Sequence, residues 1–137
     1  MAAPTPVTAT SWDGTRGLTR WYAAWTDGSQ LTDSVMVDIS TLSPAPNSVK
    51  IRRFDVLING DVSVSFEFDA TTDELIDRFI GQSDVTNYYD RNYDDGPNNG
   101  FVPTTTAAGF TGDLLLTSLN AASGDEVNAL IIFERNS

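Results

Sequence analysis

The most regular alternation of apolar and polar residues runs from Val49 to Asp69. Two runs with a period of two flank Asn59-Gly60, and this arrangement predicts a β-hairpin. A three-residue loop, Ile58-Asn59-Gly60, with Gly60 left-handed in a bulge, would place the apolar residues of both strands on one face. The expected cross-strand pairs are Val56 with Val62 and Phe54 with Val64.

The first strand of this hairpin changes phase within its own length. Ile51 is out of step with Phe54, since an odd number of positions separates the two residues. An irregularity near Arg52-Arg53 would return Val49 and Ile51 to the core face. We therefore expect a second bulge at this point.

After the hairpin the apolar period changes, and it predicts a short α-helix over about residues 72–80. Thr71 and Glu74 have the spacing of a capping box. Gly81 follows where a left-handed residue commonly ends a helix. The apolar stripe of this helix consists of Leu75, Ile76, Phe79 and Ile80.

Further segments have the composition and spacing of strands: Gly17 to Thr26, Ser34 to Ser40, Asp113 to Leu119 and Val127 to Glu134. In the first of them Trp21, Ala23 and Trp25 share one face, and the opposite face carries Arg20 and Tyr22. The last two segments are almost continuously apolar, which favours central positions in a sheet.

The elements together predict an all-β fold, an antiparallel β-sandwich or jelly-roll-like domain with one short helix. Strands follow one another at short spacing without the alternation of strand and helix that builds parallel sheets. Residues 1–14 contain Pro4 and Pro6, and we expect them to form an extended N-terminal arm. Residues 15–137 are expected to form a single sandwich domain.

The composition changes this picture mainly by what it lacks. The chain of 137 residues has no histidine and no cysteine, and Lys50 is its only lysine. General acid-base catalysis, thiol chemistry, Schiff bases and common zinc sites depend largely on these residue types. A pair of carboxylates remains possible, but most aspartates occupy turn positions. We expect a protein that is not an enzyme and has no cofactor.

The charge is strongly acidic. Nineteen acidic residues against eight basic ones give a net charge of −11, which repels phosphate backbones and anionic membrane surfaces. The first fourteen residues have no basic start and no apolar stretch like that of a signal peptide. The longest apolar run, Ala129 to Phe133, is far shorter than the ~20 residues that span a bilayer. We expect no membrane segment, no direct nucleic-acid binding, and assembly in a reducing cytoplasm.

Aromatic, acidic and turn-forming residues gather between Asn87 and Gly100, and we expect a functional loop there. Tyrosine offers a large contact area with a polar tip, so Tyr88, Tyr89 and Tyr93 are candidate partner contacts. Packing over the edge of the sandwich explains these tyrosines equally well. Trp12, on the expected arm, is a further candidate contact.

The same segment holds a weak calcium candidate. Asp90, Asn92 and Asp94 have the alternate spacing of oxygen ligands in a calcium loop. The remainder of that motif does not fit, because its glycine comes one residue late at Gly96 and Phe101 occupies the twelfth position. A solvated cluster of turn residues explains the segment better than a metal site.

Two segments resemble a known class of protein. GFTGDLLLTSLNAASGDEVNALIIFERN, residues 109–136, together with FEFDATTDELI, residues 66–76, is similar to small β-sandwich virion proteins of tailed bacteriophages. The resemblance implies a location in the virion, on the capsid or at the joint of head and tail, and implies no catalytic residues. In capsid decoration proteins of this kind an N-terminal arm reaches a neighbour, and the segment before Trp12 would match that arm.

The sequence therefore favours a capsid decoration or stabilising protein that binds the major capsid protein and copies of itself. A tail or neck component is one alternative, since an acidic surface could line a channel through which DNA slides. A host-surface or carbohydrate-binding module that uses tryptophan and tyrosine as stacking platforms is another.

Overall fold

The computed structural model describes residues 3–93 and 99–136, and in this part of the chain almost all regular structure is β-strand. A five-stranded sheet has the order β1 (Val7–Trp12), β2 (Arg16–Ala24), β9 (Glu126–Arg135), β4 (Val49–Gly60), β7 (Gln82–Asn92). A four-stranded sheet has the order β3 (Ser34–Val37), β8 (Leu114–Leu119), β5 (Ser63–Phe68), β6 (Glu74–Phe79). The paired strands are antiparallel.

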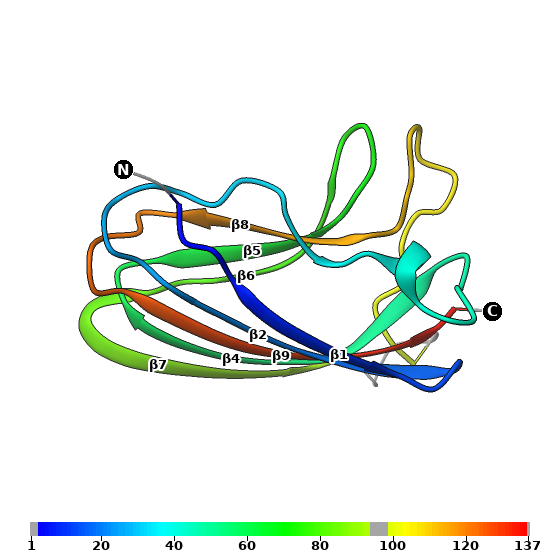
Figure 1. The fold of residues 1–137 in the computed structure, drawn as a ribbon, viewed down its shortest axis with the longest axis horizontal. Helices are drawn as coiled ribbons and strands as arrows, with labels where there is room; N and C mark the ends of the chain where they lie inside the picture. Colours follow the sequence, from blue (N-terminus) through cyan, green and yellow to red (C-terminus); the bar gives the residue numbers. More distant parts are fainter. Residues whose placement is uncertain (1–2, 94–98, 137) are drawn as a thin grey trace.

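The two sheets lie as layers of a sandwich, with the five-stranded sheet below the four-stranded sheet in Figure 1. This confirms the predicted all-β antiparallel sandwich. One short 3-10 helix, Ile39–Thr41, follows β3 in the described residues. No helix in the described ranges has the length and apolar character needed to cross a membrane.

Aromatic and branched side chains from both sheets fill the space between the layers. Trp21, Ala23 and Trp25 are buried as the alternation predicts, while Arg20 and Tyr22 lie on the outer face. The rings of Phe54 and Phe66 stack across the two sheets with centroids 4.4 Å apart. Because this core is continuous, it fixes both sheets relative to each other.

The predicted hairpin between residues 49 and 69 is wrong, although both of its strands exist. β4 pairs with β7 and β9, whereas β5 pairs with β6 and β8, so the chain passes from one sheet to the other after Gly60. The apolar residues of the two strands face each other across the core, as Phe54 and Phe66 do, instead of lying side by side. Gly60 has the expected positive φ, 103°.

The second predicted irregularity is confirmed. The register between β4 and β9 shifts between Ile51 and Arg53, and Val49 and Ile51 are buried with Phe54. β9 lies between β2 and β4, and β8 lies between β3 and β5. Both almost continuously apolar segments therefore occupy interior positions in their sheets, as expected.

The predicted helix over residues 72–80 is wrong, because this segment forms β6. The register with β5 shifts between Phe66 and Glu67, which leaves Ile76 as an extra residue in β6. This bulge buries Ile76 and Phe79, three positions apart, and so imitates a helical period. Gly81 ends no helix; a Cβ atom there would lie 2.2 Å from the carbonyl oxygen of Val62.

The predicted N-terminal arm, residues 1–14, is corrected in part. Val7–Trp12 are extended as expected, but they pair with β2 along their whole length and form an edge of the five-stranded sheet. Backbone hydrogen bonds to β2 stabilise this position, although five of its six side chains remain exposed. The segment is therefore a strand of the fold.

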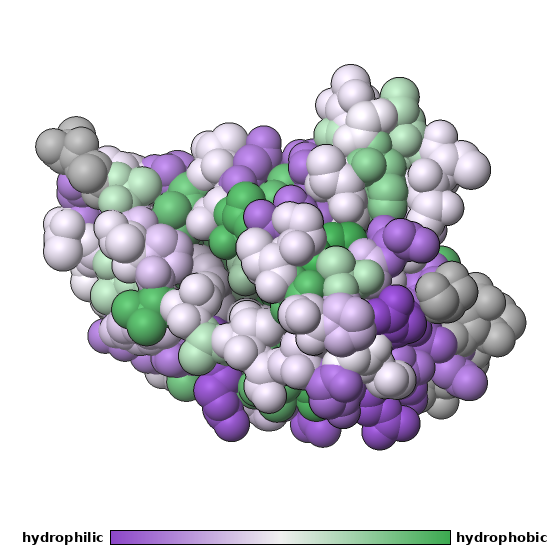
Figure 2. Space-filling model, turned by 45° about the vertical axis from the view of Figure 1, so that its right-hand side comes forward, coloured by the Kyte–Doolittle hydropathy of each residue, from purple (hydrophilic) through white to green (hydrophobic). Residues whose placement is uncertain are grey.

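Two loops project beyond the sandwich at one end. The amide of Thr71 donates to the carbonyl of Ala108 at 2.9 Å, and the hydroxyl of Thr111 donates to Asp69 at 2.6 Å. These bonds hold the loop after β5 against the loop before β8 (Figure 1). Figure 2 shows that this projection stands clear of the body.

Candidate protein-interaction surface

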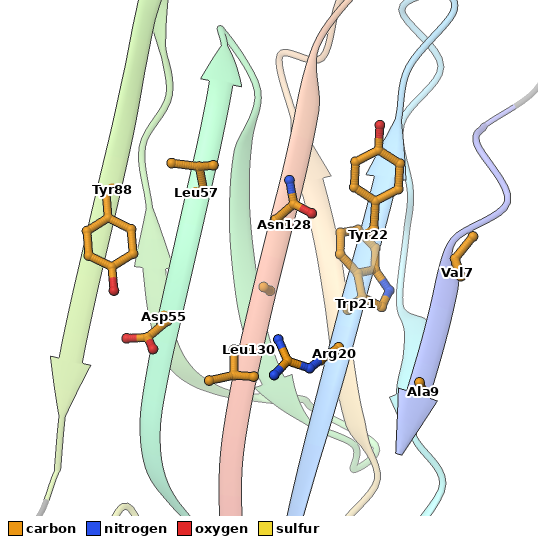
Figure 3. A pocket seen from close by; sticks show the side chains of 11 residues that line it. Val7, Ala9, Arg20, Trp21, Tyr22, Asp55, Leu57, Tyr88, Asn128 and Leu130 are labelled. Atoms are coloured by element: carbon orange, nitrogen blue, oxygen red, sulfur yellow. The ribbon is translucent and has the colours of Figure 1, made fainter. Parts of the chain in front are cut away.

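The outer face of the five-stranded sheet carries a shallow hollow of about 420 Å³. Residues from all five strands line it, and Figure 3 shows the labelled side chains. Apolar groups come from Val7 on β1, Leu57 on β4 and Leu130 on β9. The alternation of strand residues explains the hollow, since the residues between these positions point into the core.

Tyr88 stands on one side of the hollow, with 62% of its surface exposed. It lies opposite Leu57 in the pairing of β4 with β7, and Asp55 lies near its hydroxyl. Partial loss of hydration, followed by the charges of Asp55 and Asp90, raises the pKa of Tyr88.

Tyr22 stands towards the other side of the same hollow, on β2. Glu126 on the neighbouring strand lies near its hydroxyl. Loss of hydration, followed by the charge of Glu126, raises the pKa of Tyr22. Each of the two hydroxyls thus lies near a carboxylate, and a tyrosine side chain has only two torsion angles to order when a partner binds.

The polar groups of the hollow are few. Arg20 and Asn128 lie between the two tyrosines (Figure 3). Within the described ranges Arg20 makes no ion pair. Asp55, by contrast, accepts a hydrogen bond from Arg53 at 3.1 Å. An apolar and aromatic surface with scattered hydrogen-bonding groups is typical of a contact surface.

Basic residues gather at one end of this face. Arg16, Lys50 and Arg52 all approach the carboxylate of Glu134, at 3.4, 3.3 and 2.9 Å. A smaller hollow of about 230 Å³ lies among Arg16, Arg52 and Arg53. This end of the face is therefore rich in cations although the whole chain is acidic.

The other sequence-predicted contact residues lie elsewhere. Tyr89 and Tyr93 alternate with Tyr88 and point inward: Tyr89 donates to the carbonyl of Ile80 at 2.6 Å. Tyr93 donates to Asp77 at 2.5 Å and packs edge-on against Phe54. Both hydroxyls therefore have partners within the fold.

Trp12 also makes internal contacts. Its ring stacks on Phe133 with centroids 5.8 Å apart, and its indole N–H donates to the carbonyl of Pro44 at 3.0 Å. The guanidinium of Arg135 lies over the same ring at 5.9 Å. Trp12 anchors the end of β1 and remains half-buried.

Two residues of the calcium candidate, Asp90 and Asn92, lie on one face of strand β7 and not in a loop. Asp90 accepts two hydrogen bonds from Arg53, both at 3.1 Å. Asp94 lies outside the described residues.

A different acidic cluster, which the sequence did not indicate, joins Asp33, Glu67 and Asp73. Their carboxylate oxygens lie within 4.8 Å of one another, a distance that would suit a divalent cation. Burial, followed by the charges of Asp73 and Asp33, raises the pKa of Glu67. Asp73 accepts from the amide of Ala70, so the fold itself explains its position.

Comparison with known proteins assigns this chain to no family. No family model matches, and no curated protein is similar in sequence. A protein of the Bacillus endospore appendages, which form a family of disulfide-linked pili, aligns over 99% of this chain and 93% of its own, with 11% identity and a TM-score of 0.41. The Tobacco streak virus coat protein aligns over 96% and 86%, with 10% identity and a TM-score of 0.39.

A third solved structure, the capsular polysaccharide assembling protein CapF of Staphylococcus aureus, aligns over 92% of this chain and 28% of its own, with 11% identity and a TM-score of 0.33. These values describe distant likenesses in the arrangement of strands.

Proposed function

We propose that this chain is a non-enzymatic structural protein of a virion, which binds the capsid shell and stabilises it. The observation that carries the proposal is the tyrosine-lined hollow on the outer face of the five-stranded sheet. Proteins rarely leave a large contiguous apolar patch exposed unless it contacts a partner. The partners would be the major capsid protein and further copies of the chain.

The lining of the hollow supports a protein partner. Tyr22 and Tyr88 offer large flat surfaces, and the cost of ordering a tyrosine side chain on binding is small because it has only two torsion angles. Tyrosine and arginine are enriched at protein interfaces, and Arg20 lies between the two rings. The chain offers no histidine, cysteine or group of bases there that would suit catalysis.

The test is binding of the purified full chain to capsids that lack decoration. We expect saturable binding and greater resistance of the particles to heat. Tyr88→Ala should weaken binding at least tenfold, because it removes an anchor from the hollow. Val85→Ala is the matched control, since Val85 is an exposed apolar residue of the same strand on the opposite face. Absence of binding to any capsid would overturn the proposal.

A carbohydrate-binding module is the second candidate, favoured by the two tyrosine rings with Arg20 and Asn128 between them. Sugars bind to aromatic faces flanked by hydrogen-bonding groups. Binding to a glycan array that Tyr88→Ala abolishes would favour this function over capsid decoration. A tail or neck component would instead assemble into closed rings or tubes, which electron microscopy would reveal.

A further inference from the structure

The two sheets have four edge strands, and three of them are protected against pairing with another chain. β7 carries charged residues such as Asp90 and Arg91, and β6 carries Glu74, Asp77 and Arg78. β3 has only four residues and an irregular register. Charge, shortness and irregularity are the usual means by which proteins prevent edge-to-edge association.

β1 has none of these protections. Its sequence, VTATSW, contains no charged residue and no proline, and its pairing with β2 is regular throughout. Residues 7–11 are all exposed, and Val7 has 67% of its surface accessible. In Figure 1 no described strand lies beyond β1 at this edge. The edge is therefore open to an added strand.

The register identifies the backbone groups that are free. The amide of Asp13 donates to the carbonyl of Arg16 at 3.1 Å, which makes this a hydrogen-bonded pair. Such pairs alternate along an antiparallel ladder, so Val7, Ala9 and Ser11 bond to β2. Thr8, Thr10 and Trp12 consequently direct their N–H and C=O groups away from the sheet. Pro6 offers no N–H, so pairing ends there.

We infer that β1 pairs with β1 of a second copy of this chain, antiparallel, across a two-fold axis at Thr10. Thr10 then lies opposite Thr10 of the copy, and Thr8 lies opposite its Trp12. Each of these is a hydrogen-bonded pair that exchanges two N–H···O bonds. Ala9 lies opposite Ser11 of the copy in the intervening pairs, which are not hydrogen-bonded to each other.

A second copy fits this edge for two reasons. The three residues with outward-facing backbone groups, Thr8, Thr10 and Trp12, are self-complementary. A two-fold axis at Thr10 pairs the N–H and C=O groups of all three with those of the copy. A net charge of −11 opposes self-association over most of the surface, whereas β1 is uncharged and lets two copies approach. The result is a continuous sheet across both molecules, independent of whether the chain binds a capsid.

The test is the sedimentation of the full chain up to millimolar concentration. The wild type should form dimers. Thr10→Lys should raise the dimer dissociation constant at least tenfold, because two like charges then lie directly opposite each other. Thr10→Glu should do the same. An equimolar mixture of the two variants should recover association, since opposite charges then meet.

Thr10→Val is the matched control. Like the charged variants it loses the hydrogen bond between the hydroxyls of Thr10 and Thr19, yet it keeps a β-branched, uncharged edge. It should dimerise as the wild type does. A wild type that stays monomeric, or a mixture of Thr10→Lys and Thr10→Glu that does not recover association, would overturn the inference.

Amide hydrogen exchange of the wild type provides a readout that needs no variant. At low concentration the amides of Thr8, Thr10 and Trp12 should exchange quickly, while those of Ala9 and Ser11 are protected by β2. At high concentration the amides of Thr8, Thr10 and Trp12 should become protected as well. Equal exchange of the outward amides at both concentrations would contradict pairing through β1.

Discussion

β1 and β7 are the two edges of one sheet, yet the molecule holds them in different ways. β7 sends Tyr89 inward to the carbonyl of Ile80, while Tyr93, just after the strand, donates to Asp77 of β6. These bonds connect the edge to the opposite sheet. β1 has one comparable anchor, Trp12, which stacks on Phe133 within its own sheet.

This difference separates two roles: the side chains of β7 support the fold, whereas the contact that we propose for β1 depends on its backbone. The inward tyrosines make β7 part of the core, and the outward Tyr88 contributes to the hollow. β1 contributes little buried surface, so its free backbone groups remain available to another chain. Stability and association should consequently respond to different substitutions.

The largest effect is expected at the β7 end. Tyr93→Ala removes a ring that packs against Phe54 and Phe101, and it should lower the free energy of unfolding by about 3 kcal/mol. Tyr93→Phe keeps the ring but removes one donor to Asp77, which still accepts from the amide of Arg78, and should cost about 1 kcal/mol. Urea denaturation of both variants measures these losses. Equal costs for the two variants would show that the ring contributes nothing to the anchor.

Alkaline pH should weaken the contact between Tyr93 and Asp77. Burial, followed by the hydrogen bond and charge of Asp77, raises the pKa of Tyr93. The contribution of Tyr93 to the free energy of unfolding is complete below the pKa of tyrosine in the unfolded chain, about 10. It is lost as the pH rises above that value. The free energy of unfolding should fall by at most about 1.4 kcal/mol per pH unit from this group, and by less because Tyr93 is partly exposed. Denaturation between pH 9 and about 11 should therefore show a shallower fall for Tyr93→Phe than for the wild type.

The sequence predicted which residues face the core better than it predicted which strands are neighbours. Alternation correctly placed Phe54, Val56 and Phe66 inward and located the bulge near Arg52. The same alternation fits a hairpin and a crossing between layers equally well, because both put these residues in the core. The pattern alone therefore could not reveal that β4 and β5 belong to different sheets.

The false helix has a similar origin. A capping-box spacing and apolar residues three positions apart indicate a helix, yet the bulge at Ile76 gives a strand the same spacing. Leu75 and Ile80, expected in the apolar stripe, are each half-exposed in the structure. A bulge depends on the partner strand, which local sequence does not identify.

The residues that line the hollow were predicted only in part. Composition made Tyr88 a candidate contact together with Tyr89 and Tyr93, but alternation along β7 turns the latter two to the other side. Tyr22 was correctly assigned to an outer face. Its nearness to Leu130 and Leu57 depends on the strand order, and each of them comes from a different part of the chain.

The smallest effect is expected at β1. Trp12→Ala removes the stacking on Phe133 and the bond to Pro44, and should lower the free energy of unfolding by about 1 kcal/mol, since the ring is only half-buried. The loss should be local. Hydrogen exchange at Ala9 and Ser11 should accelerate strongly while the amides of β4 and β9 keep their protection. Ser11→Ala, on the exposed face of the same strand, serves as the control and should change neither quantity. A loss for Trp12→Ala as large as that for Tyr93→Ala would mean that both edges support the core equally.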